Sequence, residues 1–249
     1  MACANCGTHY LRPRLSERIL LQQYQQDSYF GEASEFGYRD YTQQQASLRK
    51  TFRVFAHRLA HRGILRGRLL EIGCARGHFI AEARRYCDYA AGVELSESAG
   101  TLARKVGDQI YRGTLDDVPV SEKFDTICAF HVLEHVYKPV EFIAEIRRRL
   151  RSGGHLLIAV PDYGSWWRHL LGSRWPSFKI PEHVTFFDRK SCSRLLGQAG
   201  FANPGKIRCV YRFPLGQLLN FVSVPVPARL QSIPIPVPAT TLALYARHE

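Results

Sequence analysis

Short apolar runs alternate with amphipathic segments between residues 68 and 160. The apolar runs predict strands over residues 68–73, 89–95, 109–113, 124–130 and 155–160. The segments between them have helical spacing and predict helices over residues 78–87, 97–106 and 138–151, the last closed by Gly153-Gly154. This alternation is typical of parallel βαβ units, so we expect an α/β fold with a doubly wound sheet. Such sheets bind ligands at the carboxyl ends of their strands.

The flanking segments extend this pattern. Leu48, Phe52, Phe55 and Leu59 recur at helical spacing until Gly63, which predicts an amphipathic helix. Residues 41–70 contain no acidic residue and seven basic ones, so the outer face of this helix is basic. Asp188 can cap a helix that reaches Ala199. Residues 205–212 and the final run TTLALYARH predict two last strands, which we expect to pair as an antiparallel hairpin.

Composition and charge narrow the class of protein. The chain has 249 residues, 45% of them hydrophobic and 22% charged, which is an ordinary globular balance. The formal net charge of +12 favours an anionic partner. Seven scattered cysteines favour buried, reduced thiols in a cytoplasmic protein, and neither a signal peptide nor a membrane-spanning run is evident.

The strongest chemical signal is the run LLEIGCARGHF at residues 69–79. A strand leads into Gly73, and after Gly77 a helix begins, so backbone N–H groups can approach a ligand closely. The G-x-x-x-G spacing lacks the G-x-G-x-x-G of dinucleotide sites, which disfavours a dehydrogenase. Glu71 is a carboxylate inside an apolar strand. It either contacts a ligand or is a buried structural group that accepts backbone hydrogen bonds. Glu94 ends the second strand, where a carboxylate can bind ribose hydroxyls or simply be exposed.

At this point the sequence resembles the class I S-adenosylmethionine-dependent methyltransferases, in particular the ubiquinone-type and bacterial sugar- or lipid-modifying branch. The similarity covers about residues 25–212, and it includes GTLDDVPVSEKFDTICAFHVLEHVYKPVEF, RRLRSGGHLLIAVPD and PEHVTFFDRKSCSRLLGQAGF. The resemblance implies a Rossmann-like, mostly parallel seven-stranded sheet with a C-terminal antiparallel hairpin. It also implies S-adenosylmethionine as the cofactor.

The resemblance assigns cofactor contacts position by position. It places Glu71, Gly73, Cys74 and Gly77 around the methionine and ribose, Glu94 at the ribose hydroxyls, Leu95, Leu115 and Asp116 near the adenine, and Phe130 and His131 beside the sulfonium. Two positions depart from the family pattern. Ala75 replaces the usual middle glycine, and Thr114 stands where many members have an acid.

A proton acceptor is needed only if the methyl acceptor must lose a proton. The candidate catalytic groups are His131, His135 and His183, because imidazole titrates near neutrality. A structural histidine is the alternative for each, and His131 has the best position, at the end of the fourth strand. Glu134 and His135 suggest a metal, but no third ligand is evident from the sequence, so we expect none.

Residues 1–40 are predicted to be an N-terminal extension, and residues 41–249 a methyltransferase domain with inserts at 162–181 and 213–238. The extension contains a single C-x-x-C, Cys3 to Cys6. It resembles the second knuckle of the complete zinc ribbon that some relatives carry before this segment. Zinc requires four ligands, so we interpret this motif as vestigial.

Several functions remain open at this stage. The leading one is methyl transfer to a small-molecule, sugar or lipid-linked acceptor in a cytoplasmic, peripherally membrane-bound enzyme. The alternatives are a nucleic-acid methyltransferase, which the FHVLEH loop disfavours, and a catalytically inactive cofactor-binding scaffold. The insert at 213–238 is apolar and proline-rich, so we expect a lid or a surface that contacts anionic lipid. The oligomeric state is left open.

Overall fold

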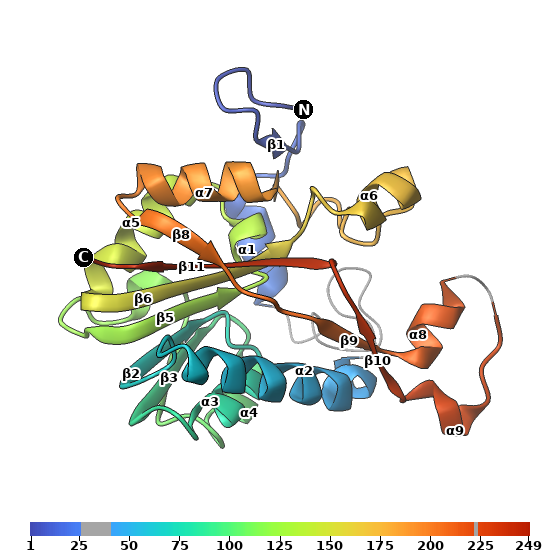
Figure 1. Cartoon of the computed structure of the whole chain (residues 1–249), viewed down its shortest axis with the longest axis horizontal. Coiled ribbons are helices and arrows are strands. Elements are labelled where there is room, and N and C mark those ends of the chain that lie inside the picture. Colours follow the sequence, from blue (N-terminus) through green and yellow to red (C-terminus); the bar gives the residue numbers. More distant parts are fainter. Residues whose placement is uncertain (26–40, 222–223) are drawn as a thin grey trace.

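The computed structural model describes residues 1–25, 41–221 and 224–249, with the side chains of residues 41–43 excepted. A seven-stranded sheet lies between two layers of helices (Figure 1). Its strand order is β4-β3-β2-β5-β6-β11-β8, with bounds β2 (Arg68–Ile72), β3 (Tyr89–Glu94), β4 (Gln109–Arg112), β5 (Phe124–Phe130), β6 (Leu150–Pro161), β8 (Ala202–Lys206) and β11 (Thr241–Arg247). The first five of these strands in the sheet order are parallel, and β11 is antiparallel to both β6 and β8. The predicted sheet is therefore confirmed.

The two faces of the sheet bury separate apolar clusters. One cluster packs under α5 (Pro139–Arg149) and α7 (Arg189–Gln198), and includes Ile143, Ile146 and Leu196. The other packs under α2 (Tyr41–His61) and α3 (His78–Ala83), and includes Phe55, Leu59 and Phe79. α4 (Glu97–Ala103) lies beside β3 and β4. Because the helices bury their apolar stripes on both faces, the carboxyl ends of the parallel strands are left as the open edge for a site.

Most predicted elements form near the predicted places, but several of their bounds differ. The helix predicted to start at residue 78 ends at Ala83, not at residue 87. The helix predicted to reach residue 151 ends at Arg149, whose buried guanidinium donates to Val118 O. Gly153 and Gly154 therefore do not close that helix, because they lie inside β6 where its register with β5 shifts.

The predicted strand over residues 205–212 is divided between two sheets. Residues 202–206 form β8 at the edge of the main sheet. An edge strand pairs on one side only, so Pro204, which lacks an N–H group, is tolerated there. Residues 211–214 form β9 (Tyr211–Pro214), which pairs with β10 (Pro234–Val237) instead. Arg212 N donates to Thr51 Oγ1 of α2, which attaches β9 to that helix. The predicted simple hairpin is thus extended by a second, two-stranded sheet.

The two inserts project from the same end of the molecule (Figure 1). The first contains α6 (Trp166–Leu171) and a 3-10 turn, η4 (Gly172–Arg174). The second contains α8 (Leu215–Asn220) and α9 (Ala228–Gln231) between β9 and β10. Six prolines limit the second insert to these short elements, as the sequence predicts.

The N-terminal residues pack on this domain. β1 (His9–Tyr10) pairs with β7 (Thr185–Phe186), and α1 (Glu17–Tyr24) buries Leu20. The remaining part of the predicted extension, residues 26–40, lies outside the described residues, and the boundary at residue 40 stays a prediction. None of the helices in the described ranges has the length and apolarity to cross a membrane.

Candidate active site

The turn between β2 and α3 has the backbone conformation of a ligand-binding loop. Gly73, Ala75 and Gly77 have φ values of 67°, 47° and 75°, in the left-handed region that favours glycine. Ala75, the departure from the family pattern, thus occupies a position where glycine would be less strained. A Cβ on Gly73 would lie 2.6 Å from Val132 Cγ2, so the loop packs closely against the segment that follows β5.

Glu94 fixes this turn from the neighbouring strand. Its Oε2 accepts a hydrogen bond from Ala75 N at 2.8 Å, and its Oε1 accepts one from Ser96 N at 2.9 Å. Burial raises the pKa of Glu94, while the backbone N–H groups of Ser96 and Ala75 lower it. Each oxygen keeps a further lone pair for a ligand hydroxyl.

Glu71 is the second buried carboxylate beside the loop. Burial raises its pKa well above the ordinary value, and the nearby Glu94 raises it further. Its Oε2 has no hydrogen-bond partner among the described residues. Glu71 also lines the cavity, and a bound cofactor would explain its unpaired oxygen, because unpaired buried polar groups are otherwise costly.

The predicted adenine side is formed by the segment after β4. Leu115 is buried and Asp116 is exposed, in the short 3-10 helix η2 (Leu115–Asp117). Thr114 is its N-cap: Asp117 Oδ2 accepts from Thr114 N at 2.8 Å. Thr114 therefore caps the turn from which the predicted adenine contacts extend. Leu95 lies opposite, directly after β3.

Phe130 ends β5, and His131 follows it directly. The Phe130 ring packs on Phe79 with centroids 4.6 Å apart, so it supports the cavity from the core. His131 has a positive φ of 55° and turns its imidazole toward Glu134, with 3.2 Å between Nδ1 and Glu134 Oε1. Burial raises the pKa of Glu134, but the hydrogen bond from His131 and the adjacent imidazoles outweigh burial and lower it to about 2. Glu134 is therefore an ionised carboxylate that orients the His131 ring.

The rings of His135 and His183 pack against each other next to Glu134, with their centroids 4.8 Å apart. His135 Nδ1 lies 2.7 Å from Tyr24 Oη and 3.0 Å from Glu182 O, and His183 Nδ1 lies 2.8 Å from Ser177 O. A carbonyl oxygen only accepts, so both rings carry their proton on Nδ1 and leave Nε2 as an acceptor. Burial lowers the pKa of His183 to about 3.

Glu134, His135 and His183 each offer one ligand atom, and these atoms all lie within 4.8 Å of one another. The sequence argument against a metal relied on the lack of a third ligand. That premise was wrong, because the fold brings His183 to a pair from which it is separated by 48 residues along the chain (183 − 135). The absence of a metal from the mechanism stays a prediction.

One cavity of about 1420 Å³ contains most of these groups. This volume exceeds the range of about 300–1,000 Å³ for a single small-molecule site, so a cofactor and an acceptor fit side by side. All the predicted cofactor contacts except Gly77 line it, and so do His131, His135 and His183. Gly77 instead faces α4: a Cβ there would lie 2.7 Å from Val106 Cγ2 and 3.1 Å from Ala103 Cα.

The sequence analysis expected a lid from the insert at 213–238, but it missed the other residues of the far half of the cavity. That half is lined by aromatic and aliphatic side chains from α1, α2, the two inserts and β9, which include Leu20, Tyr24, Leu48, Trp167, Trp175, Tyr211, Phe213 and Leu218. The Trp-Trp pair in the first insert was a usable signal, because tryptophan in a polar loop indicates a binding surface. No local signal assigns Tyr24, whose partner His135 is 111 residues away.

Comparison with known proteins supplies the family. A family model described as a methyltransferase domain matches residues 42–204, which is more than half of the chain. The chain belongs to this methyltransferase family. It is an enzyme of the class I, S-adenosylmethionine-dependent type, and S-adenosylmethionine is its cofactor.

Curated relatives of the methyltransferase match part of its length. A protein described as a probable S-adenosylmethionine-dependent methyltransferase of Mycolicibacterium smegmatis is 33% identical over 44% of this chain and 43% of its own. The mitochondrial ubiquinone biosynthesis O-methyltransferase of Candida albicans is 31% identical over 39% of this chain and 34% of its own. The chain therefore spans less than half of either relative.

Solved structures share the fold at low identity. A SAM-dependent methyltransferase of Thermotoga maritima superposes with a TM-score of 0.59 at 20% identity, covering 84% of this chain and 95% of its own. Magnesium protoporphyrin IX methyltransferase of Synechocystis, solved with bound SAM, gives a TM-score of 0.59 at 14% identity, covering 96% and 100%. These similarities define the fold of the methyltransferase and leave its acceptor open.

Proposed function

We propose that this methyltransferase transfers the methyl group of S-adenosylmethionine to a hydrophobic small-molecule or lipid-linked acceptor. The observation that carries the proposal is the apolar far half of the cavity, lined by Trp167, Trp175, Phe213 and Leu218. Apolar side chains predominate there, and a polar sugar or a nucleic-acid base would find few hydrogen-bond partners besides Lys179, Arg212 and Gln217, which disfavours both. An apolar acceptor gives up no hydrogen bonds when it binds to these side chains, and the burial of its apolar surface is favourable.

We assign the cofactor to the half of the cavity beside the turn between β2 and α3. Glu94 is our assignment for the ribose hydroxyls, since both its oxygens are held by backbone N–H groups and keep lone pairs toward the cavity. The unpaired Oε2 of Glu71 is available to the cofactor's amino acid part. Gly73, Cys74, Leu95, Leu115 and Asp116 form the surrounding walls. Bound S-adenosylmethionine supplies an already activated methyl group.

The chain's own residues then have three tasks: to align the acceptor, to exclude water and to take up a proton. His131 is our candidate for the proton, because its Nδ1–H donates to the ionised Glu134 and leaves Nε2 as the free basic atom. A buried carboxylate that orients an imidazole in this way fixes its tautomer, as in hydrolase triads. Tyr211 packs edge-on against the ring at 5.0 Å and limits its rotation. The partly exposed His131 side chain lines the cavity, so its ring can reach the acceptor.

In this proposal His135 and His183 have a structural role in the wall of the cavity. His135 Nδ1 donates to Glu182 O, which joins the loop after β5 to residues 177–183, and His183 Nδ1 donates to Ser177 O within that segment. We therefore assign them as positioning residues and not as the proton acceptor.

The test is methyl transfer from S-adenosylmethionine carrying a labelled methyl group to fractionated cell extract. We expect label in the lipid or organic-soluble fraction. Label in RNA or DNA would favour the nucleic-acid alternative and contradict the proposal. Cofactor binding by calorimetry with no labelled product in any fraction would favour the scaffold alternative.

A further inference from the structure

Exposed apolar side chains are concentrated at one end of the molecule. We define two segments there: the α6 arm, residues 163–181, and the α8–α9 arm, residues 211–221 and 224–238. Half of the large apolar side chains that are exposed in the described residues lie on these arms, namely Trp166, Leu170, Ile180, Phe221, Val224, Leu230 and Ile233. Single exposed apolar residues are normal, but a concentration of this kind marks an interaction surface.

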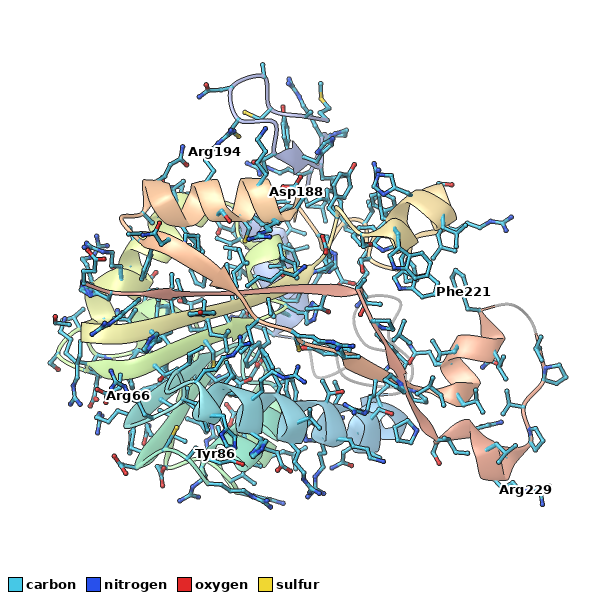
Figure 2. All side chains as sticks on the ribbon, viewed as in Figure 1. Arg66, Tyr86, Asp188, Arg194, Phe221 and Arg229 are labelled. Atoms are coloured by element: carbon cyan, nitrogen blue, oxygen red, sulfur yellow. The ribbon has the colours of Figure 1, made fainter. Side chains whose placement is uncertain are left out.

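The two arms border the same cavity. Trp167 Nε1 of the α6 arm donates to Pro238 O, at the end of the other arm, at 2.8 Å. Trp166 stacks on Trp167 with centroids 3.9 Å apart, so an exposed indole is joined to one that lines the cavity. Phe221 points from the end of α8 toward α6 in Figure 2, and it is both 50% exposed and part of the cavity wall. The exposed apolar surface is therefore continuous with the apolar half of the cavity.

The charge of the arms is of one sign. Neither arm contains an aspartate or a glutamate, and together they contain five basic residues: Arg168, Arg174, Lys179, Arg212 and Arg229. Arg174 and Arg229 are exposed, and Arg229 points away from the tip of α9 in Figure 2. Exposed tryptophan and leucine next to arginine, without acids, is the composition of segments that lie in the interface of an anionic membrane.

We propose that the two arms bind the surface of an anionic phospholipid membrane. Trp166, Leu170, Leu230 and Ile233 enter the interfacial region, and Arg174 and Arg229 contact the phosphates. This inference rests on the proposed function in one respect: an apolar acceptor dissolved in the bilayer then reaches the cavity between the arms without crossing water. A second copy of the chain is a poorer partner, because a symmetric pair would bring the two positively charged surfaces together.

The test is co-sedimentation of the full chain with vesicles of phosphatidylcholine, with and without about 30% phosphatidylglycerol. We expect the partition coefficient to rise about tenfold or more with the anionic lipid, since each exposed arginine contributes near the surface. The variant Trp166→Ser/Leu170→Ser/Leu230→Ser/Ile233→Ser should lose about tenfold or more. Arg174→Glu/Arg229→Glu should lose the dependence on anionic lipid. The control is Leu102→Ser/Val120→Ser, which removes exposed apolar side chains outside the arms and should bind like the wild type.

A second readout locates the contact. Brominated lipid should quench the tryptophan emission of the wild type, and Trp166→Phe should remove most of that quenching. The proposal would be overturned if the wild type did not bind vesicles, or if the control variant lost as much binding as the four-residue arm variant. It would also be overturned by a dimer, detected by light scattering, that the four-residue arm variant abolishes. Two assays test the proposed function independently of membrane binding: calorimetry of S-adenosylmethionine affinity, and methyl transfer to an acceptor in detergent. They are independent because none of the substituted residues lines the cavity.

Discussion

The Glu94 carboxylate accepts a hydrogen bond from Ala75 N at 2.8 Å, so the last residue of β3 holds the turn that follows β2. One side chain thereby fixes the backbone of the loop and presents oxygen lone pairs to the cavity. Two adjacent parallel strands are coupled at the edge to which we assign the cofactor.

We expect Glu94→Ala to weaken S-adenosylmethionine binding about 10- to 150-fold. The change removes charged hydrogen bonds worth roughly 1.5–3 kcal/mol from the ribose and frees the Ala75 turn. Isothermal calorimetry measures the affinity. Glu97→Ala, which removes an exposed carboxylate paired with Arg104 on α4, is the matched control. Equal affinity in both variants would remove Glu94 from the cofactor site.

Gly77 provides a prediction about stability, not about cofactor approach. A valine there would place its Cβ 2.7 Å from Val106 Cγ2, at a φ of 75°. We expect Gly77→Val to lower the free energy of unfolding by about 1–3 kcal/mol or more, through overpacking and backbone strain. Urea titration measures this. Gly197→Ala in α7, where a Cβ would contact nothing within 4 Å, should instead be neutral or stabilise by about 0.5–1 kcal/mol.

The local part of this structure could be predicted from the sequence, and the long-range part could not. Strands such as β5 and the loop from Gly73 to Gly77 depend on neighbouring residues, whose pattern is visible in one segment. The division of residues 205–212 between β8 and β9 depends on β11 pairing with β8, and on β10 and Thr51 of α2 binding β9. The contact of Tyr24 with His135 likewise depends on how α1 packs, which periodicity does not encode.

His183 should make stability depend on pH. Burial and the neighbouring His135 lower its pKa to about 3, from an ordinary value near 6.5. Between these values the unfolded state binds a proton that the folded state does not, so stability rises with pH across this window and is fully present above about 6.5. On going from pH 6.5 to pH 5 we expect a loss of about 2 kcal/mol from this group.

Urea unfolding at a series of pH values tests this slope. His183→Gln should be less stable at pH 7 and should lose part of the acid-side slope. His57→Gln, on the exposed face of α2, is the control for removing an imidazole. An unchanged slope in His183→Gln would show that the group titrates alike in the folded and unfolded states.

The cysteines should react in a fixed order. Cys3 and Cys6 are half-exposed, and the hydroxyl of Thr8 lowers the pKa of Cys6 by hydrogen bonding. Burial raises the pKa of Cys87 to about 12 and that of Cys209 to about 12, and it raises those of the buried Cys74, Cys128 and Cys192 as well. Since the thiolate is the nucleophile, a disulfide reagent at neutral pH should modify Cys6 first and the buried thiols only after denaturation. Mass spectrometry of the time course identifies the sites, and early labelling of Cys128 would contradict the burial described here.

The pair formed by His131 and Glu134 leads to a kinetic prediction. His131→Gln should lower the turnover of a proton-releasing acceptor by about 10²–10⁴-fold, the usual contribution of a general base, while S-adenosylmethionine affinity changes little. Glu134→Gln keeps the ring in place but removes the charge that fixes its tautomer, so we expect a loss of up to about 10⁴-fold. Single-turnover kinetics with calorimetry on the same samples separate the chemical step from cofactor binding. His57→Gln is again the control, and full turnover in His131→Gln would mean that alignment of the acceptor in the cavity suffices without a protein base.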